Sequence, residues 1–158
     1  MVLAQFHSKG RFKKRMLLWV WCLMIGVSVF ANCQKRAVEP VALAPEDMCS
    51  HCRMAISEKQ YAGELIDDQG TAFKFDDIGC MINFMKSPQN KTTIAASFVM
   101  DFNDRQWIKA DSAYYIRSSE FTTPMNGGIV AFGEESKAQE AVKKYQGTML
   151  RFKDILGR

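Results

Sequence analysis

The chain has 158 residues, of which 47% are hydrophobic, with 21 Lys and Arg, 17 Asp and Glu, five Cys and only two His. Five of the cationic residues and no acid precede Cys33, which leaves 16 cations against 17 acids in the remainder. A nearly neutral body without a basic stripe argues against nucleic acid as a partner. Beyond the leader His51 is the only imidazole, which excludes metal sites that need two His from one subunit.

The first 32 residues have the features of a secretory signal peptide. A basic cluster from Lys9 to Arg15 precedes the uncharged, apolar run Met16–Phe30. This run is shorter than the roughly 20 residues of a membrane-spanning helix, although an uncleaved signal anchor remains an alternative. The stretch Phe30–Cys33 resembles a bacterial lipobox, which implies cleavage before Cys33 and lipidation of its thiol. We therefore expect an extracytoplasmic protein tethered to a membrane by a lipid, on the periplasmic side in a two-membrane bacterium.

A tether and a single domain are expected after the signal peptide. Residues 33–46 contain two Pro and show no helical period, which predicts an extended linker. The domain is expected to cover residues 47–158. Its first strands are predicted at Tyr61–Asp67 and Thr71–Phe75, because turn residues separate two alternating segments.

A helix is predicted directly after this hairpin. Asp76 or Asp77 can cap its beginning, and Ser87-Pro88 ends it. Its apolar positions recur with helical spacing, which predicts a buried stripe formed by Ile78, Met81, Ile82 and Met85.

The second half repeats this order of elements. Strand patterns at Ser97–Phe102, Gln106–Lys109 and Ala113–Arg117 precede a helix that begins near Glu134. The buried stripe of that helix is expected at Ala138, Ala141, Val142 and Tyr145. The sequence therefore predicts an α+β fold with two ββα-like modules packed as one small domain.

The segment Met48–Met54 concentrates the chemistry of the chain. It holds two thiols, two thioethers and His51 within seven residues. Thiolate and thioether ligands together favour Cu(I), whereas Zn(II) gains little from Met. Cys49 and Cys52 can converge on one ion across a turn, and Met54 can join them if the chain beyond Cys52 is extended.

A C-x-x-C motif alone leaves other interpretations open. In an exported protein it also fits a local structural disulfide in a binding module. It also fits a thiol–disulfide oxidoreductase with Cys49 as the exposed nucleophile, although that class expects a strand before the motif and a helix at it. Here a Pro-bearing linker precedes the motif and a hairpin follows.

Three motifs occur in the order C-x-x-C-R-M at Cys49–Met54, F-D-D-I-G-C-M at Phe75–Met81 and T-P-M at Thr123–Met125. In this order they resemble the NosL family, which consists of lipid-anchored accessory proteins of nitrous oxide reductase regarded as copper chaperones. The resemblance implies a protein without enzymatic activity. Such a protein would bind Cu(I) and deliver it to an acceptor, with the copper–sulfide centre of nitrous oxide reductase as the implied destination. Members of the family commonly have Gly where this chain has Arg53, and many lack the Cys found at Cys80.

Other residues have two interpretations each. Cys80 projects opposite the predicted helix stripe, so it either faces the surface or reaches the thiols of the N-terminal motif. Met125 lies in a turn fixed by Pro and Gly, where it can be a ligand or a gate. Asp76, Asp77 and Asp101 could bind or orient a ligand, but capping and turn formation account for two of them. The sequence leaves open whether the protein forms a homodimer.

The candidate metal ligands are Cys49, His51, Cys52, Met54, Cys80 and Met125.

Overall fold

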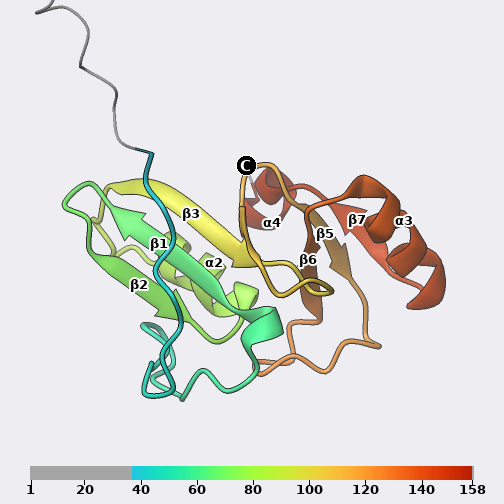
Figure 1. Ribbon diagram of the computed structural model, residues 1–158, viewed down its shortest axis with the longest axis horizontal. Coiled ribbons are helices and arrows are strands. Elements are labelled where there is room, and N and C mark those ends of the chain that lie inside the picture. The colour runs from blue at the N-terminus through green and yellow to red at the C-terminus, as the bar shows by residue number, and fades with distance from the viewer. Residues whose placement is uncertain (1–36, 158) are drawn as a thin grey trace, which may run out of the picture. The chain divides into compact units, whose positions relative to one another are not determined.

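Seven strands form two antiparallel sheets in the computed structural model, which describes residues 37–157 (Figure 1). The first sheet has the strand order β2-β1-β3-β4, and the second has the order β6-β5-β7. This arrangement is the α+β fold that the sequence predicts. The strands are β1 (Gly63–Asp67), β2 (Ala72–Phe75), β3 (Ile94–Met100), β4 (Trp107–Lys109), β5 (Tyr114–Arg117), β6 (Ile129–Phe132) and β7 (Thr148–Leu150).

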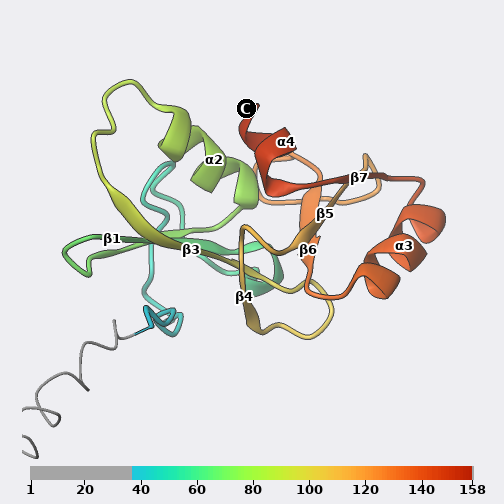
Figure 2. The same cartoon turned by 90° about the horizontal axis from the view of Figure 1, so that it is seen from above.

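Helices accompany both sheets. α2 packs on the first sheet, α3 packs on the second, and α4 lies between α2 and the second sheet (Figure 2). No helix within residues 37–157 is long and apolar enough to cross a bilayer. The helices are the 3-10 turn η1 (Lys59–Tyr61) and the α-helices α2 (Ile78–Lys86), α3 (Glu135–Lys144) and α4 (Phe152–Leu156).

The predicted hairpin forms from β1 and β2. Oδ1 of Asp67 accepts the backbone N–H groups of Gln69 and Thr71 at 2.9 and 2.7 Å, which closes the turn. Gly70 adopts a φ of 86° there, a conformation that favours glycine. The register pairs Leu65 with Phe73.

The helix α2 begins where the sequence predicts. The side chain of Asp77 accepts the N–H of Gly79 and so caps the first turn. Ile78 and Met81 are buried against the first sheet, as expected for the stripe. Met81 approaches β1 so closely that a Cβ on Gly63 would lie 2.9 Å from its Sδ atom, and a larger residue at that position would not fit.

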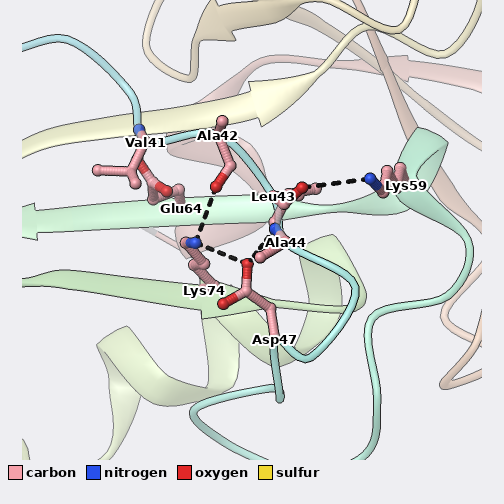
Figure 3. A network of polar contacts seen from close by, with 8 residues as sticks. All are labelled: Val41, Ala42, Leu43, Ala44, Asp47, Lys59, Glu64 and Lys74. Carbon is pink, nitrogen blue, oxygen red and sulfur yellow. Dashed lines mark hydrogen bonds and ion pairs between the residues drawn. The ribbon is translucent and has the colours of Figure 1, made fainter.

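Residues 41–47, named here the N-terminal strap, lie along the face of the first sheet opposite α2 (Figures 1 and 3). Nζ of Lys74 donates to the carbonyl of Ala42 at 2.9 Å and to Oδ2 of Asp47 at 2.6 Å. The N–H of Val41 donates to Oε1 of Glu64 at 2.8 Å. Packed contacts therefore begin within the segment that the sequence assigns to the tether.

The strands are grouped differently from the two modules that the sequence predicts. β3 and β4 join the first sheet, while β5, β6 and α3 form the second ββα unit and β7 adds a third strand. Asp101 links the two sheets, because its Oδ2 accepts the N–H of Gly133 at 2.7 Å and its Oδ1 closes the turn after β3. The turn role expected of Asp101 is thus present.

Candidate metal centre

Residues 48–55, named here the cysteine loop, form a tight turn that brings Cys49 and Cys52 together. An isolated antiparallel bridge between Met48 and Ala55 closes its ends. Within it, the N–H of Cys49 donates to the carbonyl of Met54 at 2.8 Å. Arg53 has a φ of 66°, the left-handed conformation that glycine adopts most readily. The turn orients Sγ of Cys49 toward the backbone N–H of Cys52, at a distance of 3.5 Å.

Strand β2 and helix α2 position the remaining members of the cluster. The N–H of Ser50 donates to the carbonyl of Lys74 at 2.8 Å and so holds the cysteine loop against β2. Asp76 follows β2 directly, and Cys80 lies in the first turn of α2. Sγ of Cys52 donates to Oδ2 of Asp76 at 3.4 Å.

The sulfur atoms of Cys49, Cys52 and Cys80 and a carboxylate oxygen of Asp76 all lie within 4.8 Å of one another. The structure thus brings together three of the six predicted ligands and adds one acid. Cys80 is buried and reaches the N-terminal motif, which was one of the two positions considered for it. All three cysteines are free thiols. We name these four residues the thiol cluster.

Burial within the thiol cluster is nearly complete. Cys49, Cys80 and Asp76 are 0%, 1% and 2% exposed, whereas Cys52 is half-buried and gives access from solvent. Burial raises the pKa values of the Cys52 and Cys80 thiols, and the neighbouring Asp76 raises both further. These two thiols are therefore protonated at neutral pH, and a metal that binds them must displace their protons.

The carboxylate of Asp76 is incompletely paired. Oδ2 faces the Cys52 thiol, but Oδ1 is buried without a hydrogen-bond partner among the described residues. Asp77 alone caps α2, which leaves Asp76 free to face the sulfur atoms. Sequence reasoning allowed Asp76 to bind or orient a ligand, but capping could equally account for it, and it was not included among the candidate metal ligands. The feature of the sequence that could have identified Asp76 is the pair Asp76-Asp77. Only one residue caps the beginning of a helix, which leaves the other carboxylate available for another role.

The other predicted ligands lie at the surface. Met54 and Met125 are 45% and 46% exposed, and His51 is exposed and is not part of the thiol cluster. The loop of Met125 nevertheless lies next to the beginning of α2, since the N–H of Met125 is 3.4 Å from Oδ2 of Asp77. Cys33, the predicted lipidation site, lies outside the described residues.

Comparisons with known proteins agree with the resemblance noted in the sequence. The family model described as NosL matches residues 40–157. The copper-binding lipoprotein NosL of Stutzerimonas stutzeri is 28% identical over 130 residues, which cover 77% of this chain and 68% of the relative. The copper chaperone NosL from Shewanella denitrificans has a similar crystal structure, with a TM-score of 0.67 and 23% identity over 75% of this chain and 96% of that chain. Neither relative is named as an enzyme, in agreement with the expectation for this chain.

Proposed function

The chain belongs to the NosL family, and from this premise we propose that it binds Cu(I) outside the cytoplasm and passes the ion to an acceptor protein. The observation that carries the proposal is the convergence of three free thiols within 4.8 Å. Thiolates are soft ligands, and Cu(I) is among the ions that such ligands select. In this proposal Cys49, Cys52 and Cys80 hold the ion.

The burial of the cluster suits a protein that must both hold and release its metal. Cys49 and Cys80 are enclosed, which protects a bound ion from water and from competing ligands. Cys52 is half-buried, so an incoming ligand of the acceptor can approach the ion from its side. Release then proceeds by ligand exchange at Cys52, with no need to open the core.

The exposed thioethers suit the entry and exit of the ion. Met54 follows Cys52 by two residues, and the Met125 loop lies at the beginning of α2. A thioether binds Cu(I) more weakly than a thiolate does, so a copper ion can rest there without being trapped. Met54, Met125 and the exposed His51 are therefore proposed as transient ligands between the thiol cluster and the acceptor.

The family and the leader support a proposal for the acceptor and for the location. The relative from Stutzerimonas stutzeri is named a lipoprotein, and Cys33 follows a lipobox-like stretch in this chain. We propose that a lipid on Cys33 holds the domain near the membrane. The copper–sulfide centre of nitrous oxide reductase is the proposed destination, because assembly of that centre is the role associated with the family.

The rival interpretation as a thiol–disulfide oxidoreductase has less support. It requires Cys49 as an exposed nucleophile, but Cys49 is 0% exposed. The more accessible Cys52 has a raised pKa, whereas reactive thiols of that class have lowered values.

X-ray absorption at the copper K edge tests the proposed ligand set. The purified, reduced chain is loaded with one equivalent of Cu(I), and its spectrum is compared with that of Cys80→Ser. We expect a first shell of sulfur atoms only in the parent, with one sulfur fewer in Cys80→Ser. A shell dominated by nitrogen or oxygen, or a shell that Cys80→Ser leaves unchanged, would contradict the proposal.

A further inference from the structure

A site made only for Cu(I) leaves Asp76 incompletely explained, because only its Oδ2 has a partner, the Cys52 thiol. The side chain of Asp76 is 2% exposed, and Oδ1 has no hydrogen-bond partner among the described residues. A buried carboxylate oxygen without a partner is unfavourable, and such groups in proteins usually have a ligand or a donor. Oxygen is a poor ligand for Cu(I), so the proposed copper site does not supply a partner for Oδ1 of Asp76.

The thiol cluster has the composition of a four-coordinate site with three sulfur ligands and one oxygen ligand. Its four donor atoms lie within 4.8 Å of one another. In a tetrahedral zinc site with ordinary bond lengths, neighbouring donor atoms are about 3.5 to 3.8 Å apart. Shifts of the donor atoms by about an ångström or less would therefore close the cluster around an ion.

Charge also favours an ion with more than one positive charge. Three thiolates and one carboxylate would place four negative charges in a nearly buried cluster, and Cu(I) neutralises only one of them. A divalent ion neutralises two, which lowers the electrostatic cost of burying the ligands.

We propose that Cys49, Cys52, Cys80 and Asp76 form a tetrahedral site for a divalent cation of the Zn(II) type. This site shares its thiols with the proposed copper site, so the two ions exclude each other. It goes beyond copper delivery, because Asp76 coordinates the divalent ion and not Cu(I). Each bound ion displaces the protons of the thiols it binds, which pass to solvent or buffer.

Co(II) is the probe, because tetrahedral Co(II) bound to thiolates absorbs strongly in the visible range. The purified, reduced and metal-free chain is titrated anaerobically with Co(II). We expect one equivalent to bind with the bands of a tetrahedral thiolate site. Asp76→Asn should weaken Co(II) binding by at least about 10-fold, since even outer residues of metal sites have effects of this size.

Two controls separate a ligand from a merely structural residue. Asp68→Asn changes an exposed carboxylate in the hairpin turn and should leave Co(II) binding unchanged. Cu(I) affinity, measured with a chromophoric chelator, should change less than about threefold in Asp76→Asn, because oxygen is a poor Cu(I) ligand. A fall of both affinities to a similar extent would contradict the proposal, because Asp76 would then support the binding of both ions alike and not act as a ligand of the divalent ion alone.

A measurement on the parent chain avoids any effect of substitution on folding. X-ray absorption at the zinc K edge of the Zn(II)-loaded chain should give three sulfur atoms and one oxygen atom. The absence of tetrahedral Co(II) bands, or a zinc shell without oxygen, would overturn the proposal. The two proposals can fail separately. A chain that does not bind Cu(I) but has an intact Co(II) site would refute only the copper function. A chain that binds Cu(I) but has no tetrahedral Co(II) site would refute only this inference.

Discussion

The ammonium group of Lys74 lies 2.6 Å from Oδ2 of Asp47, and this pair joins β2 to the N-terminal strap. Both side chains are largely buried, with exposed fractions of 14% and 20%. The backbone carbonyl of Lys74 also accepts the N–H of Ser50 in the cysteine loop. One residue of β2 therefore connects the strap on one side with the candidate metal centre on the other.

Replacing Lys74 with Met should destabilise the domain. The substitution keeps the apolar stem but removes the ion-pair partner of Asp47 and the cation near Glu64, which should lower the free energy of unfolding by about 2 to 3 kcal/mol. Chemical denaturation followed by circular dichroism measures the change. Lys109→Met on the exposed side of β4 is the control and should shift stability by less than about 0.5 kcal/mol. Equal stability of the two variants would rule out this role of Lys74.

Glu64 should make the stability depend on pH. Its side chain is fully buried opposite Lys74, and burial raises its pKa above the ordinary value of 4.5. Asp47 and Lys74 face it, and its partner on β3, Phe98, is uncharged. The folded state thus retains this proton to higher pH than the unfolded state. The stabilisation is complete below the ordinary pKa and is lost as pH rises through the raised pKa.

Glu64→Gln removes this titration, so the stability of the variant relative to the parent should increase as pH rises above 4.5 and then level off. Asp47 behaves oppositely, because Lys74 lowers its pKa and its contribution is lost as pH falls, but it is present in both proteins. Urea denaturation at a series of pH values measures the difference. Glu120→Gln at the surface should show no such trend. A difference that is constant with pH would refute the role of Glu64.

Oxidation and copper loading should exclude each other. A disulfide between Cys49 and Cys52 would remove two of the three proposed thiolates, so oxidised protein should take up little Cu(I), and a reductant should restore uptake. The measurement compares free thiols and copper content in oxidised, reduced and copper-loaded protein. The same comparison in a Cys22→Ser/Cys33→Ser/Cys80→Ser variant restricts the free-thiol signal to Cys49 and Cys52. If oxidised protein takes up as much Cu(I) as reduced protein, the ligands must be sought among Met54, Met125 and His51.

If Cys33 carries a lipid, the protein should be found in the membrane fraction of cells. Cys33→Ser should release it from membranes, because the tether then has no lipid. Cys22→Ser is a matched control within the predicted signal peptide and should leave membrane association unchanged. Fractionation of cells and detection of the protein in each fraction gives the answer. A Cys33→Ser protein that stays as firmly bound as the parent would instead support an uncleaved anchor formed by residues 16–30.

The parts of the fold that were predictable from sequence have local signals. The β1–β2 hairpin has turn residues between alternating strands, and α2 has a cap, a stripe and a Pro after its end. The assignment of β3 and β4 to the first sheet was not predictable, because strand pairing depends on contacts between distant segments. β7 and α4 are too short, at three and five residues, to show a period.

The candidate site was predictable to a similar extent. The spacing of Cys49 and Cys52 predicts that they converge, because it is local. The position of Cys80 could not be decided from the sequence, because its face of the helix could have been covered or exposed. In the structure Cys49 packs in the same core cluster, and Cys80 is buried there. Asp76 was not included among the candidate metal ligands because a carboxylate before a helix is normally a cap, and only the structure distinguishes it from Asp77.

The most direct test of whether the thiol cluster is a copper site is a competition experiment, in which the reduced chain competes with a chelator for Cu(I) and with another chelator for Zn(II). The reduced chain should bind one Cu(I) in preference to Zn(II), because thiolates favour the softer ion. The Cys49→Ser/Cys52→Ser double variant should lose more than about 100-fold in Cu(I) affinity, a larger effect than removing an outer residue. The account is contradicted if the parent binds Zn(II) well but binds Cu(I) no more tightly than the double variant does.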